Sequence, residues 1–153
     1  MTNILLIEDE VHKRDELVGS IDQFYQGKAT LEHVDSVHAA FWAVSERTFD
    51  LVILDMALPT FSTSTGGAAE RGHDQAMGGI EILRKLKSKG TRSKIIIITQ
   101  YPEITVAGKR LKLTAAAEAL SARYDQDIVG GVLYKYKSKA NHIKLTTLLK
   151  KLV

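Results

Sequence analysis

The chain contains no cysteine, which excludes disulfides, cysteine-ligated zinc and a thiol nucleophile, and which is typical of proteins of the reducing cytoplasm. It also lacks long apolar runs. The longest are residues 4–7, 51–54 and 95–98, far short of the roughly 20 residues that a membrane-spanning helix needs. The first expected strand begins at Asn3 or Ile4, which leaves no room for a signal peptide ahead of it. We therefore expect a cytoplasmic protein without a membrane span.

The 153 residues are 44% hydrophobic and 25% charged, which predicts one compact domain over residues 1–153. The net charge is only +3, but many lysines gather near the end of the chain. They are Lys135, Lys137, Lys139, Lys144, Lys150 and Lys151. No arginine-rich or aromatic-interleaved pattern accompanies them, so a solvated helix face is the better interpretation, and nucleic acid is not expected as a partner.

Three short runs rich in Ile, Val and Leu are continuous rather than alternating, as in strands that are covered on both faces of a parallel sheet. Two weaker strands complete the set. The expected strands are residues 4–7, 30–34, 51–54, 95–98 and 131–136. Segments with helical spacing lie between them, and one contains Phe41 and Trp42, which we expect in the core. This alternation predicts a flavodoxin-like, doubly wound α/β fold with strand order 2-1-3-4-5 and about five helices.

Two segments do not fit a minimal version of this fold. Residues 60–77 follow Pro59, are rich in Ser, Thr and Gly, and have no apolar periodicity, so we expect a long loop inserted after the third strand. Such a loop is either a partner-binding element or a passive insertion. Residues 101–130 contain only one clear helical pattern, over Leu113–Tyr124.

Polar side chains follow the expected strands where ligands bind in open parallel sheets. Glu8 and Asp9 follow the first strand, Asp55 the third, Thr99 the fourth, and Lys135 lies near the end of the fifth. Because strands one and three are neighbours in the expected order, the three carboxylates should meet. Unpaired carboxylates repel one another, and a hard divalent cation such as Mg²⁺ resolves the conflict. Helix capping explains any one of these acidic residues, but not the whole set.

Five stretches in this order resemble the signature blocks of response-regulator receiver domains. They are ILLIEDE (residues 4–10), DLVILDMALP (50–59), GGIEILRKLK (78–87), KIIIITQ (94–100) and GGVLYK (130–135). The resemblance covers nearly the whole chain apart from the two segments above. It implies a phosphoacceptor signalling domain of a two-component system, not an enzyme beyond its own phosphorylation and dephosphorylation.

The resemblance also implies a role for each matching residue. Asp55 would be the phosphoacceptor, Thr99 the switch hydroxyl, and Lys135 the partner of the phosphoryl group. The implied Mg²⁺ ligands are Glu8, Asp9, Asp55 and the backbone carbonyl of Ala57. The implied partners are a histidine kinase or phosphotransfer protein as donor and a separate output protein, with a second copy of the chain as a further candidate.

Some residues depart from the family pattern. Gln100 stands where the family usually has a small residue, which puts access to the phosphoryl site in question. Val132 occupies the position of the switch aromatic, for which Tyr134 or Tyr136 could substitute. Lys137 is a rival to Lys135 as the phosphate lysine, although Lys135 fits the strand better.

These departures leave two alternatives open. One is a degenerate receiver that binds a partner without phosphorylation. The other is an enzyme of the haloacid-dehalogenase type. Such enzymes place an acid two residues after the nucleophile, where this chain has Ala57, so we favour the receiver.

Overall fold

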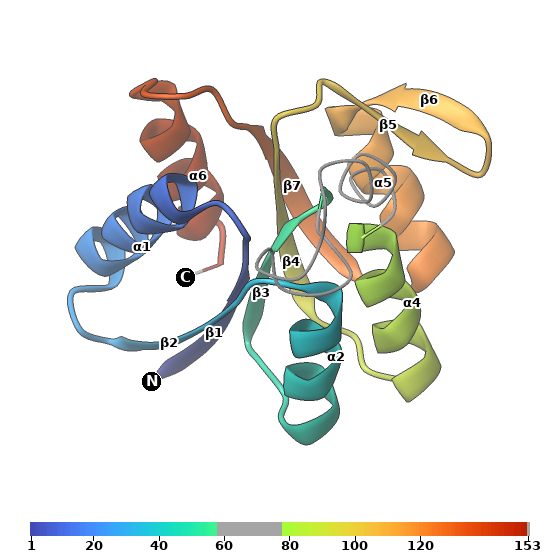
Figure 1. Ribbon diagram of the computed structural model, residues 1–153, viewed down its shortest axis with the longest axis horizontal. Helices are drawn as coiled ribbons and strands as arrows, with labels where there is room; N and C mark the ends of the chain where they lie inside the picture. Colours follow the sequence, from blue (N-terminus) through green and yellow to red (C-terminus); the bar gives the residue numbers. More distant parts are fainter. Residues whose placement is uncertain (58–77, 153) are drawn as a thin grey trace.

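The computed structural model describes residues 1–57 and 78–152 and is built around one five-stranded parallel sheet (Figure 1). The strand order is β2-β1-β3-β4-β7, which confirms the doubly wound order predicted from the sequence. The strands are β1 (Thr2–Ile7), β2 (Ala29–Val34), β3 (Leu51–Asp55), β4 (Lys94–Thr99) and β7 (Asp127–Leu133).

Helices cover both faces of the sheet, as expected for parallel strands joined by crossover connections (Figure 1). The described residues form α1 (Val11–Tyr25), α2 (Val37–Glu46), α4 (Gly78–Lys89), α5 (Leu113–Tyr124) and α6 (Ala140–Lys150). Helices α1 and α6 pack on one face, and α2, α4 and α5 pack on the other. The predicted bounds of α5 are confirmed.

The central strands are buried on both sides, which explains their continuous apolar runs. Along β1, Leu5 and Ile7 belong to the cluster under α2, α4 and α5, whereas Ile4 and Leu6 belong to the cluster under α1 and α6. All five residues of β3 are buried. The end of β3, which carries Asp55, is therefore held by packing from both layers.

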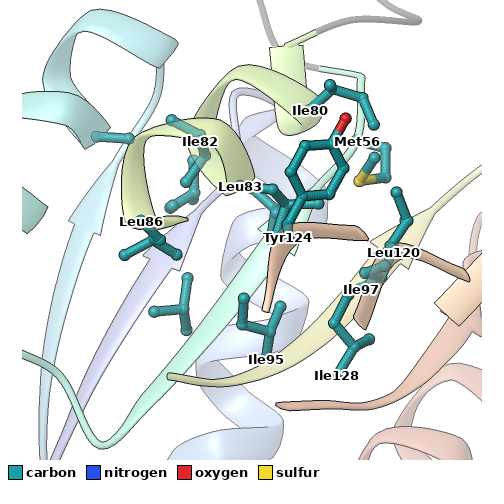
Figure 2. Packing of buried hydrophobic residues seen from close by; sticks show 14 of the residues in the cluster. Met56, Ile80, Ile82, Leu83, Leu86, Ile95, Ile97, Leu120, Tyr124 and Ile128 are labelled. Carbon is teal, nitrogen blue, oxygen red and sulfur yellow. The ribbon is translucent and has the colours of Figure 1, made fainter. Parts of the chain in front are cut away.

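The packing around α4 fixes the chain that follows β3. Figure 2 shows Met56 and Ile80 close to Leu83 and Tyr124, in the layer beneath α4 and α5. Gly79 lies directly against this turn, because a Cβ atom at Gly79 would come 2.7 Å from the Cα of Met56. The backbone amide of Gly79 also donates a hydrogen bond to the Met56 carbonyl at 3.0 Å.

The fifth parallel strand begins earlier than the sequence predicted. Strand β7 covers Asp127–Leu133 rather than residues 131–136, so Tyr134 and Tyr136 follow the strand. Gly130 and Gly131 lie within it, where added Cβ atoms would come 2.8 Å from Leu148 of α6 and 2.7 Å from Leu113 of α5. The two glycines therefore allow both helices to approach the strand closely.

A two-stranded antiparallel hairpin between β4 and α5 was not predicted. Strands β5 (Glu103–Val106) and β6 (Lys109–Lys112) are joined by Ala107 and Gly108, which both have positive φ angles, as in the turns that match the twist of a hairpin. Ile104 and Val106 are buried in the cluster that contains α5. The hairpin is therefore anchored on the same layer as α4 and α5 (Figure 1).

Further predictions from the sequence concern the core residues of α2, the loop after β3 and membrane spans. Trp42 was expected in the core, but its side chain is 68% exposed on α2, while its neighbour Phe41 packs against the core. The predicted loop at residues 60–77 lies outside the described residues. Among the helices of residues 1–57 and 78–152, none is long and apolar enough to cross a membrane.

Candidate functional site

Three carboxylates meet at the carboxyl ends of β1 and β3. These strands are paired, with Ile7 opposite Leu54, so Glu8 and Asp9 follow one strand beside Asp55 at the end of the other. One oxygen of each carboxylate lies within 4.8 Å of the others. Glu8 and Asp55 are only 1% and 3% exposed. The structure thus confirms that these three residues lie together, as the strand order predicted.

Lys13, which the sequence analysis missed, contributes a positive charge to this cluster. Its ammonium lies 2.8 Å from Glu8 Oε1 and 3.6 Å from Asp55 Oδ2. The side chain is 2% exposed. Lys13 lies in the first turn of α1, four and eight residues before the buried Leu17 and Ile21, so all three share the face that packs on the sheet.

The helix phase was the available signal for Lys13. Val11, the first residue of this helix, is apolar but exposed. Counting back from Leu17 and Ile21 by one helical turn leads to Lys13 instead. A lysine at such a buried position indicates a nearby negative partner, because lysine is almost never buried unpaired.

Burial determines the electrostatics of the cluster. It raises the pKa of the Asp55 carboxyl well above the ordinary value, and the charge of Glu8 adds to the shift, while Lys13 and the Ala57 amide oppose it. Burial by itself lowers the pKa of Lys13, but the charges of Asp55 and Glu8 outweigh this effect and raise it overall. Lys13 therefore stays charged beside Glu8 and Asp55.

Glu8 and Asp55 each accept a backbone amide with one carboxylate oxygen. Glu8 Oε2 accepts the Glu10 amide at 3.1 Å, and Asp55 Oδ1 accepts the Ala57 amide at 3.0 Å. Glu8 Oε1 is buried and has the Lys13 ammonium at 2.8 Å, and within the described residues it accepts no further hydrogen bond. A buried oxygen with free lone pairs among three carboxylates fits the oxygen-only ligand set of Mg²⁺.

Thr99 ends β4 and is fully buried next to this edge of the sheet. Asp55 is paired with Ile98, so Thr99 lies one residue beyond the strand partner of the carboxylate. The Thr99 hydroxyl accepts the Tyr101 amide at 3.1 Å, and the Thr99 carbonyl accepts the Tyr134 amide at 2.7 Å. Thr99 thereby links the chain that leads to the hairpin with the end of β7.

Lys135 and Lys137 follow the end of β7. Both are exposed, and within residues 1–57 and 78–152 neither ammonium forms an ion pair. Asn141 fixes the backbone of Lys135 by accepting its amide at 3.0 Å and donating to its carbonyl at 2.7 Å. The Lys137 ammonium lies 5.3 Å from the centre of the Tyr136 ring. The role of Lys135 stays a prediction.

The structure also shows where Gln100 and Val132, which depart from the family pattern, lie. The exposed Gln100 donates a hydrogen bond to Glu10 at 3.2 Å. Val132 is buried with Tyr134 in the cluster under α1 and α6. The strand partner of Thr99 is the next residue, Leu133, so Val132 faces the opposite side of the sheet from that partner. The Tyr134 hydroxyl donates a hydrogen bond to Glu16 of α1.

Comparisons with known proteins agree with this fold. No protein-family model matches the chain. The Detocs response regulatory protein DtcB of Vibrio alginolyticus is 30% identical over 122 residues, which cover 79% of this chain and 80% of that protein. The DtcB protein of Enterobacter cloacae is 24% identical over 150 residues, which cover 97% of each chain.

Among solved structures, the chain is similar to the response regulator TrrA of Thermotoga maritima in complex with Mg²⁺-BeF. The alignment covers 100% of both chains, with a TM-score of 0.61 and 21% identity. TrrA has also been crystallised with the histidine kinase ThkA. At this identity the structural likeness shows the fold alone, whereas the match to DtcB of Vibrio alginolyticus shows the family. The chain therefore belongs to the response-regulator receiver family and is related to the Detocs response regulatory protein DtcB.

Proposed function

We propose that this receiver accepts a phosphoryl group on Asp55 from a histidine kinase or phosphotransfer protein and thereby changes its binding to a separate output protein. The observation that supports this proposal is the meeting of Glu8, Asp9 and Asp55 within 4.8 Å at the ends of two adjacent strands. We also propose that residues 1–153 form a single receiver unit, with residues 60–77 inserted in it. Its covalent chemistry is limited to its own phosphorylation and dephosphorylation.

The transfer needs a nucleophile and positive charge. A carboxylate oxygen of Asp55 attacks phosphorus, the bond from phosphorus to the donor histidine nitrogen breaks, and the imidazole keeps the electron pair. Glu8, Asp9, Asp55 and the Ala57 carbonyl are the proposed Mg²⁺ ligands. When bound, Mg²⁺ supplies positive charge that offsets the negative charge on the transferred oxygens. Attack of water on the acyl phosphate then restores the Asp55 carboxylate.

Thr99 is the proposed reporter of the phosphorylated state. A phosphoryl group brings new acceptor oxygens and a charge of about −1.5 to −2 to the end of β3. If the Thr99 hydroxyl turns to donate to one of these oxygens, its contact with the Tyr101 amide changes. Tyr101 leads into the β5–β6 hairpin, so this rearrangement alters the surface formed by the hairpin and α5.

The degenerate receiver is the second candidate function. Two observations favour it: Asp55 is only 3% exposed, and Lys13 already lies 3.6 Å from its carboxylate. In this case the chain binds its partner with an unmodified Asp55. The intact carboxylate cluster is the argument against it.

Acetyl phosphate with MgCl₂, followed by intact mass spectrometry, separates the two candidates. The phosphoacceptor should gain one phosphoryl group, Asp55→Asn should gain none, and Asp15→Asn, at an exposed position on α1, should behave like the wild type. In a transfer assay with a phosphorylated histidine kinase, the wild type and Asp15→Asn should again be phosphorylated and Asp55→Asn should not. No mass gain in the wild-type protein under either condition would favour the degenerate receiver.

A further inference from the structure

Lys13 places a positive charge inside the pocket that the proposed function fills with a metal ion. We propose that Lys13 is a resident cation of this pocket, which neutralises Glu8 and Asp55 without metal and competes with the divalent ion for their oxygens. This inference rests on the proposed Mg²⁺ site, but it assigns a role to a residue outside the family's signature positions. The ligand concerned is a hard divalent cation.

The first support is the position of the ammonium. It lies 2.8 Å from Glu8 Oε1 and 3.6 Å from Asp55 Oδ2, and so it lies between two of the three carboxylates. Mg²⁺ binds carboxylate oxygens at about 2.0–2.1 Å. An ion held by the same two oxygens would therefore lie within a few ångströms of the ammonium. Two cations so close in a buried site repel each other strongly, since solvent does not screen them.

The second support is that the lysine is held in place. Its ammonium lies 5.3 Å from the centre of the Tyr134 ring, a cation–π contact. Tyr134 is fixed through its hydroxyl to Glu16, and the Asn141 side chain donates to the same carboxylate at 3.2 Å. Because Lys13 also belongs to the buried face of α1, it cannot turn into solvent without disturbing this packing.

The charge balance gives the consequence. Lys13 forms ion pairs with both Glu8 and Asp55. Without Lys13, these two buried carboxylates would lose the positive charge beside them and repel each other, which destabilises the metal-free fold. The same loss would favour Mg²⁺, because the ion would no longer compete with a fixed positive charge. Lys13 thus stabilises the metal-free protein and weakens metal binding.

Lys13→Met tests both effects, since methionine keeps a flexible unbranched stem and removes the charge. We expect the variant to bind Mg²⁺ at least about tenfold more tightly than the wild type by isothermal titration calorimetry. In EDTA it should melt at a lower temperature. Lys13→Arg keeps a charge and should retain weak Mg²⁺ binding. Lys28→Met removes an exposed lysine between α1 and β2, outside the pocket, and should leave Mg²⁺ affinity within about twofold.

Equal or weaker Mg²⁺ binding by Lys13→Met would overturn the proposal, as would the absence of Mg²⁺ binding in both proteins. If Lys13→Met does not fold in EDTA, recovery of its circular dichroism on adding MgCl₂ supports the proposal, and Lys13→Gln provides a second neutral variant for calorimetry. A failure of the proposed phosphorylation can be distinguished from a failure of the Lys13 proposal. In that case no mass is gained from acetyl phosphate, while the order of Mg²⁺ affinities is unchanged.

Discussion

The side-chain amide of Gln100 donates a hydrogen bond to the carboxylate of Glu10 at 3.2 Å and joins the segment after β4 to the segment after β1. Strand β3 lies between β1 and β4 in the sheet. The contact therefore spans the end of the strand that carries Asp55. We therefore predict that Gln100 affects access to Asp55 from the rim of the pocket, where it bonds to Glu10.

Gln100→Ala removes this bridge and should increase the rate of phosphorylation by acetyl phosphate about fivefold. The estimate follows from the loss of one exposed hydrogen bond worth about 1 kcal/mol, which has to open before the donor enters. Intact mass measured against time gives the rate. Gln23→Ala, at an exposed position on α1, is the control. Equal rates for Gln100→Ala and wild type would show that the bridge does not limit access.

Gly79→Ala should destabilise the protein by about 1–3 kcal/mol, because it overpacks a fixed site. The new Cβ would come 2.6 Å from Met56 Sδ and 3.1 Å from the Asp55 carbonyl. Displacement of this turn should also slow phosphorylation. Gly19→Ala on α1 is the matched control, since its Cβ meets no atom within 4 Å. It should stabilise the protein by about 0.5–1 kcal/mol through helix propensity. Urea denaturation measures both, and equal stabilities would contradict the prediction.

Asp55 should make the metal-free protein less stable as the pH rises. Because burial, followed by the charge of Glu8, raises its pKa well above 3.8, the folded protein binds the proton more tightly than the unfolded chain does. Between the unfolded and the folded pKa, the unfolded chain carries fewer protons. The free energy of unfolding therefore falls as pH rises through this window and stays low above it.

Asp55→Asn removes this ionisation and should raise the melting temperature in EDTA by a few degrees at pH 8, with a smaller gain at pH 5. Thermal unfolding followed by circular dichroism gives the comparison. Asp15→Asn, at an exposed position on α1, is the control. With MgCl₂ the wild type should melt at a higher temperature than Asp55→Asn, because the variant lacks one of the three carboxylates. A gain that grows toward low pH would contradict the assigned direction of the Asp55 shift.

The sequence was sufficient for the central sheet and for the acidic cluster. Strands β1, β3 and β4 were recognisable because burial on both faces requires continuous apolar runs, as in the fully buried β3. Once the order of these strands was expected, the meeting of Glu8, Asp9 and Asp55 followed from their positions at strand ends. Such features depend on backbone topology more than on the side chains of other elements.

The features that were missed depend on packing between elements. The position of β7 depends on Gly130 and Gly131, which have weak strand propensity but allow α5 and α6 to approach. The β5–β6 hairpin turns at Ala107 and Gly108, a weaker signal than Asn-Gly. Lys13 was missed because a charged residue was not expected on the buried face of a helix, where only its carboxylate partners make it acceptable.

Asn141 provides the last prediction, because it connects the stability of α6 with the proposed role of Lys135. The Asn141 side chain is buried and bonds to the amide and the carbonyl of Lys135 and to Glu16. Asn141→Ala leaves the Lys135 amide without its acceptor and removes one donor each from the Lys135 carbonyl and from Glu16, so it should cost about 2–3 kcal/mol. Thr147→Ala, at an exposed position on the same helix, should cost under about 1 kcal/mol.

The functional effect separates two roles for Asn141. If Lys135 pairs with the phosphoryl group, then Asn141→Ala releases its backbone and should slow phosphorylation by acetyl phosphate about tenfold, as Lys135→Ala should. The double variant should be no slower than Lys135→Ala alone, because both changes remove the same interaction and their effects are then not additive. Additive losses would show that Asn141 acts through another contact, such as Glu16 and Tyr134. A wild-type rate for Lys135→Ala would remove Lys135 from the proposed site and leave Lys13 as the lysine nearest to Asp55, at 3.6 Å.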